Sequence, residues 1–265
     1  MTKTALITGA SSGIGKELAL YHASRGGNLI IVARRENLLN ELKADISSRY
    51  NVKVKVIATD LTKPDSPNKI WKILEEENIE IDYLINNAGF GGYGDFASRE
   101  LDTDLKMIDL NIKTLVSLTH LFLNKMRNKN SGKILNVASS AAFLPGPLQS
   151  VYYATKAFVV SFSEGISEEL KDKNITVTIL CPGYTETEFK DTASMNGSYI
   201  TKITGASPRK VAIYGYKAME KGRLIAIYPR YLSFLIRYIL PFSPEKLKIK
   251  LSRKLMEKSK IKKDN

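Results

Sequence analysis

Short apolar runs alternate with amphipathic stretches along most of the chain. The run Thr4–Thr8 is apolar and rich in β-forming residues, and a glycine-containing turn separates it from a segment with apolar residues at helical spacing. This order of strand-like run and helix-like segment recurs as far as Tyr228. Because parallel neighbouring strands need helical crossover connections, the pattern predicts an α/β fold with a doubly wound parallel sheet flanked by helices.

Seven strands are predicted, with helices between them. The strands are Thr4–Thr8, Asn28–Ala33, Val52–Ala58, Asp82–Ile85, Lys133–Val137, Thr176–Leu180 and Arg223–Tyr228. The helices include Glu36–Tyr50, Pro64–Glu77, a long one over about Leu101–Met126, one from Tyr152 and one from Pro208. Since no linker or internal repeat divides this part, we expect one domain over residues 1–229 and an apolar, then basic, helical extension over 230–265.

The composition is that of a globular protein with a surplus of basic residues. Hydrophobic residues make up 43%, charged residues 25%, and the formal net charge is +13. The single Cys181 excludes an internal disulfide, and two histidines are too few to favour a metal site. The chain starts on a strand-like run and not on a signal peptide, so we expect a cytoplasmic protein. Basic and aromatic residues do not alternate as in a nucleic-acid platform.

Three glycines follow the first strand immediately and open the first helix. Gly9, Gly13 and Gly15 are spaced G-x-x-x-G-x-G. Glycines let the backbone approach a pyrophosphate, and a helix N-terminus offers free N–H groups and the positive end of its dipole. This turn is therefore predicted to bind a dinucleotide.

Two arginines stand at the end of the second predicted strand. In a dinucleotide-binding fold an acidic residue there binds the 2′-hydroxyl of NAD, whereas arginine accommodates the 2′-phosphate of NADP. Here Arg34 and Arg35 come first, and no acid occurs before Glu36. The alternative is surface pairing with Glu36 or Glu41. Because a guanidinium matches a phosphate bidentately and the glycine turn precedes it, we predict NADP(H).

Polar residues also follow other strands of the predicted sheet. Asp60 can hydrogen-bond an adenine amino group or serve in a turn or helix cap, and Asn86–Gly89 can close a cofactor groove or form a simple turn. Ligands of such sheets bind at the carboxyl ends of the strands. We therefore expect these residues to lie near the glycine turn.

Tyr152 and Lys156 are the strongest candidates for acid–base chemistry. Their spacing of four places them on one face of a helix. A phenol has an ordinary pKa of about 10, and an ammonium one turn away is expected to lower it towards neutrality. Ser139 precedes a Pro-Gly-Pro loop and can hold a carbonyl oxygen against the phenol. The alternative is an exposed tyrosine stacked on a lysine stem.

Together these residues resemble the short-chain dehydrogenase/reductase family of NADP-preferring type, over about Thr4–Tyr228. Its glycine motif is similar to Thr8–Gly15, its Asn-Asn-Ala-Gly motif to Asn86–Gly89, and its Pro-Gly motif to Pro182-Gly183. The resemblance implies a Rossmann-type fold and a homodimer or homotetramer. A basic residue often found in NADP-preferring members is absent at Ser12, which leaves the two arginines to bind the phosphate.

The resemblance also implies a role for each candidate residue. Tyr152 would exchange a proton with the substrate oxygen, Ser139 would polarise that oxygen, and Lys156 would lower the tyrosine pKa and hold the nicotinamide ribose. Asn111 would organise a water near Lys156. The implied cofactor contacts are Gly9, Ser11, Ser12, Gly13, Ile14, Gly15, Arg34, Arg35, Asp60, Leu61, Asn87, Ala88, Gly89, Tyr152, Lys156, Pro182, Gly183, Thr185 and Thr187.

The C-terminal extension has an apolar part and a basic part. The run Tyr231–Phe242 is interrupted by Arg237 and is too short to span a membrane. We expect it to cover the substrate pocket and form a subunit interface, and we rank peripheral membrane contact through residues 231–263 second.

These patterns predict an NADPH-dependent oxidoreductase acting on a hydrophobic carbonyl or alcohol. The alternative within the class is a hydroxysteroid dehydrogenase. The alternatives outside it are a non-catalytic NADP-binding sensor and a membrane-surface protein.

Overall fold

All seven predicted strands form one parallel sheet. The computed structural model describes residues 2–202 and 204–258. The strands are β1 (Thr4–Thr8), β2 (Asn28–Ala33), β3 (Val54–Ala58), β4 (Tyr83–Asn86), β5 (Gly132–Val137), β6 (Ile175–Pro182) and β7 (Ile225–Tyr228). Their order is β3-β2-β1-β4-β5-β6-β7, and every neighbouring pair is parallel. The predicted fold class is confirmed, and strand ends differ from the prediction by no more than about two residues.

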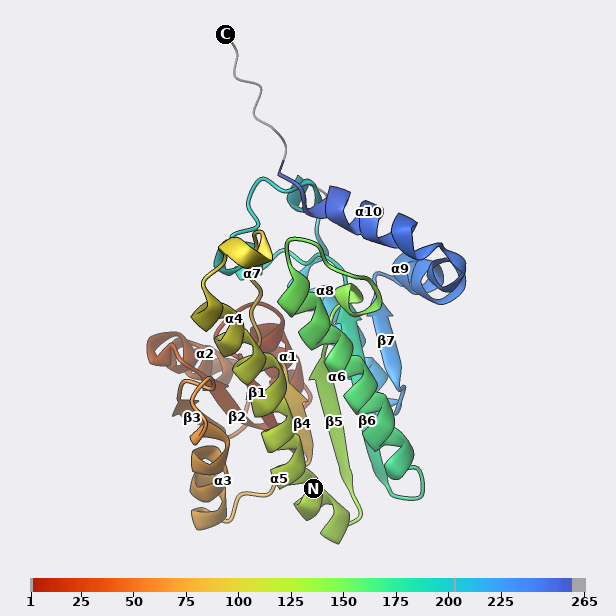
Figure 1. The fold of residues 1–265 in the computed structure, drawn as a ribbon. Helices are drawn as coiled ribbons and strands as arrows, with labels where there is room; N and C mark the ends of the chain where they lie inside the picture. Colours follow the sequence, from red (N-terminus) through yellow and green to blue (C-terminus); the bar gives the residue numbers. More distant parts are fainter. Residues whose placement is uncertain (1, 203, 259–265) are drawn as a thin grey trace.

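In the described part of the chain, ten α-helices cover the two faces of the sheet and its carboxyl end (Figure 1). They are α1 (Gly13–Ser24), α2 (Glu36–Arg49), α3 (Ser66–Glu76), α4 (Leu101–Ile108), α5 (Leu115–Asn128), α6 (Ser150–Glu169), α7 (Phe189–Thr192), α8 (Pro208–Glu220), α9 (Arg230–Phe234) and α10 (Glu245–Met256). The buried clusters place α1, α2 and α8 on one face and α3, α5 and α6 on the other.

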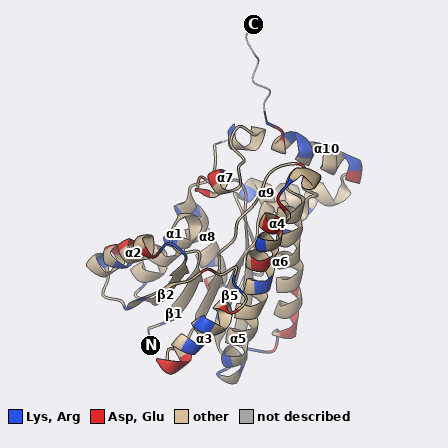
Figure 2. Ribbon diagram, turned by 60° about the vertical axis from the view of Figure 1, so that its left-hand side comes forward, with Lys and Arg blue, Asp and Glu red and all other residues tan. Residues whose placement is uncertain are grey.

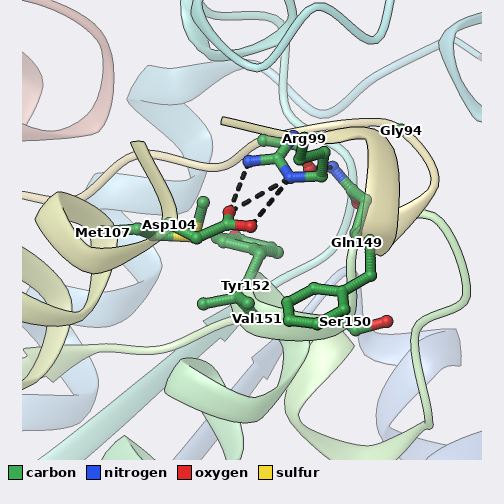
Figure 3. Close-up of a pocket in the computed structure, with 10 residues that line it drawn as sticks. Gly94, Arg99, Asp104, Met107, Gln149, Ser150, Val151 and Tyr152 are labelled. Carbon is green, nitrogen blue, oxygen red and sulfur yellow. Dashed lines mark hydrogen bonds and ion pairs between the residues drawn. The ribbon is translucent and has the colours of Figure 1, made fainter. Parts of the chain in front are cut away.

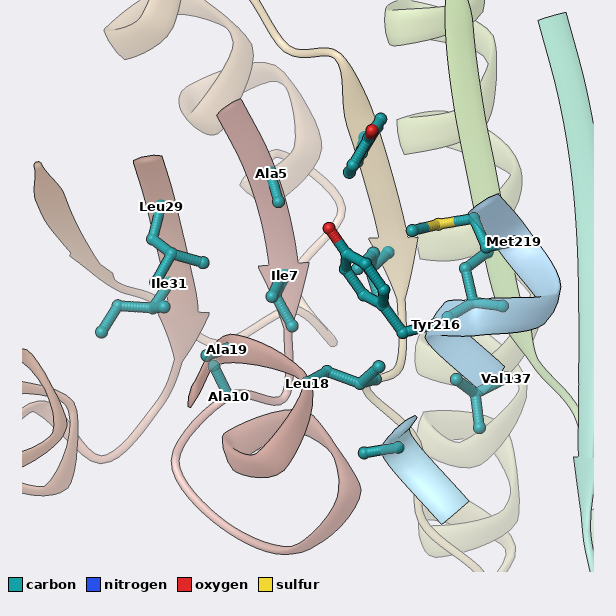
Figure 4. Close-up of a cluster of buried hydrophobic side chains, with 14 of the residues drawn as sticks. Ala5, Ile7, Ala10, Leu18, Ala19, Leu29, Ile31, Val137, Tyr216 and Met219 are labelled. Atoms are coloured by element: carbon teal, nitrogen blue, oxygen red, sulfur yellow. The ribbon is translucent and has the colours of Figure 1, made fainter. Parts of the chain in front are cut away.

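Alternate residues of each central strand point to opposite faces of the sheet and pack in the buried clusters on those two faces. Ile7 and Ile31 pack in the cluster under α1 and α8, whereas Leu6 and Ile30 pack in the cluster under α3 and α5. Figure 4 shows the first of these clusters, in which Tyr216 of α8 reaches towards β1. Because both faces are buried, these strands are continuously apolar, which is typical of parallel sheets.

The strand order reverses beside β1, which pairs with β2 on one side and with β4 on the other. In doubly wound sheets such a reversal opens a crevice at the carboxyl ends of the strands. The turn Gly9–Ser12 follows β1, and Asn87 follows β4. The sequence therefore places both at the crevice.

The long helix predicted over 101–126 is divided by a π-helical turn. The turn spans Asp109–Thr114 and separates α4 from α5. A π turn inserts an extra residue into the helix and is frequent at functional sites. Asn111 lies in this turn.

The extension after β7 is helical in the part that the structure describes. α9 continues into a π-helical turn at Leu235–Ile239 and a 3₁₀ turn at Leu240–Phe242, and α10 follows. The prediction for 230–265 also covers residues 259–265, which lie outside the described residues. Within residues 2–202 and 204–258, no helix has both the length and the hydropathy needed to cross a bilayer.

Candidate active site at the carboxyl end of the sheet

Tyr152 and Lys156 share the face of α6 that packs on the sheet. Both are buried, with 8% and 5% of their surfaces exposed. The same face continues into Val159 and Ser163, so the helical period that buries the apolar residues also buries this pair. The Lys156 Nζ donates a hydrogen bond to the carbonyl oxygen of Val137 at 2.9 Å, which anchors it to the end of β5. The alternative of an exposed tyrosine on a lysine stem does not hold.

The Tyr152 pKa is not lowered towards neutrality, as the spacing from Lys156 predicted, but shifted the other way. Burial raises the Tyr152 pKa well above its ordinary value, and the hydrogen bond with Ser139 opposes that shift. Lys156 lies over the ring, with its Nζ 5.9 Å from the ring centre. Burial also lowers the Lys156 pKa, to about 8. The physical reason is that taking either group out of water penalises its charged form, a cost that the four-residue spacing does not reveal.

Ser139 is held at the end of β5 by its local backbone. Its hydroxyl accepts a hydrogen bond from the Ala141 N–H at 3.1 Å and lies 3.5 Å from the Pro182 carbonyl oxygen. A 3₁₀ turn, Ser140–Phe143, starts directly after it. Ser139 therefore caps this turn on one side and interacts with the Tyr152 phenol on the other.

Asn111 makes contacts that the sequence did not reveal. Its Nδ2 donates to the carbonyl oxygen of Phe90 and to the Thr155 Oγ1, both at 3.0 Å, and its Oδ1 accepts from the Phe90 N–H at 3.2 Å. A Cβ on Gly89 would lie 3.0 Å from the Asn111 Oδ1 and 3.4 Å from the Lys156 Nζ. The side chain thus ties the π turn to the loop after β4, close to Lys156. Its predicted role with a water stays a prediction.

The glycine turn fits closely against the end of β4. Gly9 has a φ of +67°, and a Cβ there would lie 2.8 Å from the Asn87 Nδ2. A Cβ on Gly15 would lie 2.2 Å from the Gly9 carbonyl oxygen. The Asn87 Nδ2 donates to the Thr8 carbonyl at 2.9 Å. These contacts bring the N-terminus of α1 next to the strand ends and leave no room for side chains at either glycine.

Arg35 crosses from β2 to the glycine turn. Its Nη2 donates to the hydroxyls of Ser11 and Ser12 at 3.2 and 2.9 Å and pairs with Glu188 at 2.8 Å. The predicted alternative was pairing with Glu36 or Glu41, but the acidic partner of Arg35 comes from the segment before α7. Its guanidinium holds the pKa of Glu188 below the ordinary value.

Asp60 and Arg34 lie close to each other beyond the ends of β2 and β3. The Asp60 Oδ1 accepts hydrogen bonds from the Thr62 N–H at 3.1 Å and the Thr62 hydroxyl at 2.9 Å. These bonds, with the charge of Arg34, outweigh the effect of burial and lower the Asp60 pKa. The turn role that was one alternative for Asp60 is therefore present.

The remaining predicted cofactor contacts lie around the same strand ends. Thr187 packs on the glycine turn, because a Cβ on Gly13 would lie 3.1 Å from its Cγ2. The Thr185 hydroxyl donates to the Gly183 carbonyl at 3.0 Å. Ala88 donates its N–H to the Thr8 hydroxyl at 3.0 Å, and the Leu61 carbonyl accepts from Thr114.

A pocket next to Tyr152 contains an ion pair that the sequence analysis missed. Arg99 and Asp104 face each other above Tyr152 (Figure 3), and the Arg99 Nε lies 3.1 Å from both carboxylate oxygens. The Gln149 Nε2 donates to the Gly92 carbonyl at 3.2 Å on the same side. The sequence does show Asp104 in the first turn of the predicted helix. Its partner Arg99 lies before that helix, so helical spacing does not predict that the two side chains pair.

The fold and this arrangement define a class: a Rossmann-type sheet with a tyrosine, a lysine and a serine at the carboxyl ends of its strands. The family model described as short chain dehydrogenase matches residues 3–196. The chain belongs to the short-chain dehydrogenase family of oxidoreductases.

Individual relatives support this assignment. The chain is 37% identical over 190 residues to a very-long-chain 3-oxoacyl-CoA reductase of Danio rerio, covering 70% of this chain and 60% of that protein. It is 34% identical over 206 residues to a 17-beta-hydroxysteroid dehydrogenase type 3 of Homo sapiens, covering 76% and 64%. A short-chain dehydrogenase from Sphingobium yanoikuyae, solved in complex with NADPH, is 31% identical with a TM-score of 0.82, covering 88% and 90%. The chain thus matches less than two thirds of the length of these two curated relatives.

The residues at the β1 crevice fit a nicotinamide dinucleotide. The free N–H groups of the first turn of α1 and the hydroxyls of Ser11 and Ser12 form a donor set of the kind that binds phosphates. Gly9 and Gly13 present bare backbone at the same turn, with φ values of +67° and +54°.

Proposed function

We propose that the protein is an NADP(H)-dependent oxidoreductase that interconverts a carbonyl group and a secondary alcohol on a hydrophobic substrate, with Tyr152 as the general acid/base. The observation that carries this proposal is the position of Tyr152. Its buried phenol interacts with Ser139 at the carboxyl end of the sheet, and its side chain lines a narrow, closely packed pocket together with Met107, Val151 and the Arg99–Asp104 pair.

The neighbouring residues prepare the substrate oxygen for proton transfer. Ser139 and Tyr152 would both donate hydrogen bonds to that oxygen, and the phenol proton would move to it as negative charge develops. Lys156, anchored on the Val137 carbonyl, would hold positive charge beside the tyrosine ring. A bound nicotinamide would supply the hydride.

Burial of Tyr152 affects proton transfer in both directions. Because burial raises its pKa, the phenol carries its proton at neutral pH. Reduction forms the phenolate and alcohol oxidation starts from it, so the same burial acts on both reactions.

Arg34 and Arg35 support NADP(H) over NAD(H). Arg35 already donates to two hydroxyls of the glycine turn, and Arg34 lies within electrostatic range of Asp60 at the adjoining strand end. Two guanidinium groups in this place suit a 2′-phosphate. The relative solved with NADPH supports the same choice.

Long-chain 3-oxoacyl thioesters are the first substrate class that we propose, and steroid ketones are the second. The names of the relatives support both classes. The test is a panel of 3-oxoacyl thioesters of increasing chain length, steroid ketones, aliphatic aldehydes and sugars, followed by the loss of NADPH absorbance. We expect kcat/KM to increase with apolar chain length. Turnover of sugars alone would contradict the substrate class, and tight NADPH binding without any turnover would favour the sensor alternative.

A further inference from the structure

The helical segment after β7 exposes an unusual amount of apolar surface. The large hydrophobic residues of this segment with exposed side chains are Tyr231, Phe234, Leu235, Tyr238, Ile239, Phe242, Leu247, Ile249 and Leu251. We call them the C-terminal apolar surface. They are nine of the fifteen exposed large hydrophobic residues in the described part of the chain, and Phe242 is 86% exposed. Single exposed apolar residues are ordinary, whereas a contiguous group marks an interaction site.

The first six of these residues form one helical stripe. They stand at positions i, i+3, i+4, i+7, i+8 and i+11 counted from Tyr231, the pattern that keeps side chains on one face of a helix. The opposite face is already used, because Leu232 and Ile236 pack in the cluster that contains Ile227 and Cys181. A Cβ on Gly183 would lie 2.5 Å from the Leu232 Cδ1, so α9 is pressed onto the end of β6. The stripe therefore faces outward because the other face of the helix is fixed to the core.

Basic residues surround this surface. The described segment from residue 230 to residue 258 contains eight Lys or Arg and two Glu, a net charge of +6. The basic residues are Arg230, Arg237, Lys246, Lys248, Lys250, Arg253, Lys254 and Lys258. Figure 2 shows several of them in blue along α10. Both glutamates pair with basic residues of α10, Glu245 with Lys248 and Glu257 with Arg253.

On α10 two of the exposed apolar residues share a face with lysines. Leu247 and Leu251 are four residues apart, and Lys250 and Lys254 follow the same spacing beside them. Long lysine side chains can lay their methylene stems along an apolar surface and keep the ammonium at its polar boundary. Tyrosine, with an apolar ring and a polar hydroxyl, suits the same boundary.

The positive charge of this segment favours an anionic membrane over a second copy of the chain as the partner of this surface. A two-fold dimer through it would place one segment of +6 charge against another, and like charges brought together oppose association. An anionic lipid surface offers the opposite charge to the basic residues and an apolar layer to the aromatic ones. Within the described residues, the helices of this segment are too short and too polar to cross a bilayer, as expected for interfacial binding.

We infer that the C-terminal apolar surface docks on an anionic membrane. This inference stands independently of the proposed activity, because it rests on exposed apolar residues and charge alone. It has a consequence for the site: Met256 of α10 packs in the same buried cluster as Tyr152 and Tyr153. The docked surface and the pocket are thus parts of one packed unit at the carboxyl end of the sheet, which would place the pocket near the lipid.

The test is co-sedimentation of the full chain with sonicated vesicles of phosphatidylcholine alone or with about one third phosphatidylserine. We expect binding to the anionic vesicles to exceed binding to the neutral ones by at least about tenfold and to weaken in high salt. The double variant Phe234→Glu, Phe242→Glu should lose at least about tenfold of this binding, because it places charges in the apolar stripe. The matched control is Leu101→Glu, which changes an equally exposed apolar residue on α4 and should bind as the parent chain does.

Circular dichroism and the thermal midpoint check that each variant is folded. Equal binding to neutral and anionic vesicles, absence of binding, or retained binding by the double variant would overturn the inference. A parent chain that is dimeric by light scattering, is dissociated by the double variant and does not bind vesicles would also overturn it, and would assign the surface to a second copy.

Discussion

The Lys156 Nζ lies 5.9 Å from the centre of the Tyr152 ring, while its hydrogen bond goes to the carbonyl oxygen of Val137. Lysine and tyrosine are therefore close without forming the direct charge pair that their spacing suggested. Burial dominates both groups, raising the pKa of the phenol and lowering that of the ammonium to about 8.

The rate of carbonyl reduction should depend on the protonation of Lys156. With a pKa of about 8, the side chain is an ammonium below that pH and an amine above it. We expect kcat/KM at saturating NADPH to be level below pH 8 and to fall above it, measured in constant-ionic-strength buffers. The arginine of Lys156→Arg keeps its charge over the same pH range. The kcat/KM of this variant should therefore not fall above pH 8, whatever its absolute rate. A profile identical in both proteins would contradict the assignment.

Arg34 should contribute to the preference for NADPH. Removing a hydrogen bond to a charged phosphate costs about 1.5–3 kcal/mol, and because this side chain is exposed we expect the lower end of that range. Arg34→Ala should weaken NADPH binding about tenfold and leave NADH binding unchanged, measured by fluorescence titration. Arg49→Ala, an exposed arginine at the far end of α2, is the matched control. Equal losses for the two cofactors would show that Arg34 does not contact the phosphate.

Glu188 should limit NADPH binding by engaging Arg35. The two side chains pair at 2.8 Å with about half of each exposed, so their interaction is worth no more than about 1 kcal/mol. Glu188→Gln removes the competing charge. We predict that NADPH binds up to about fivefold more tightly to this variant, whereas NADH affinity stays the same. Weaker NADPH binding would mean that Glu188 supports the site and does not compete for it.

His22 should make the protein less stable in mild acid. Its Nε2 lies 3.1 Å from the Asn28 carbonyl oxygen and 3.2 Å from that of Lys3, and its Nδ1 lies 2.8 Å from the Tyr216 hydroxyl. Burial lowers its pKa below the ordinary 6.5. Between these two pKa values the unfolded chain binds more protons than the folded one, so stability falls as the pH falls below 6.5.

The effect of His22 can be measured from urea midpoints at about pH 7.5 and pH 5. The parent chain should lose stability over this interval. His22→Gln should be less stable at both pH values because it disturbs a buried, hydrogen-bonded position. Its stability should nevertheless change less between the two pH values than that of the parent chain. An equal pH dependence of the two proteins would assign the effect to other groups.

The fold was predictable because strand and helix periods are local properties. The run Asn28–Ala33 is apolar on both faces, and its ends in the structure are those predicted. The residues at the strand ends were found for the same reason, since a parallel sheet brings all carboxyl ends to one edge. Lys156 and Tyr152 share a helix face as their spacing required.

Interactions between distant segments were not predictable. Glu188 meets Arg35 across 153 residues of sequence, and only the folded chain brings them together. The burial that governs the pKa of Tyr152 depends on Phe189, whose ring centre lies 5.2 Å away, and on other neighbours from separate elements. The direction of the outward stripe after β7 was also hidden, because both faces of that helix are apolar.

The central claim is that Tyr152 donates the proton in carbonyl reduction. Its neighbour Tyr153 is also buried, and the two ring centres are 6.1 Å apart, so Tyr153→Phe is a matched control for Tyr152→Phe. In single-turnover mixing of NADPH-loaded protein with a 3-oxoacyl thioester, Tyr152→Phe should be slower by at least about a hundredfold at unchanged NADPH affinity, and Tyr153→Phe should keep most of the rate. Equal rates for Tyr152→Phe and the parent chain, or equal losses in both variants, would contradict the account.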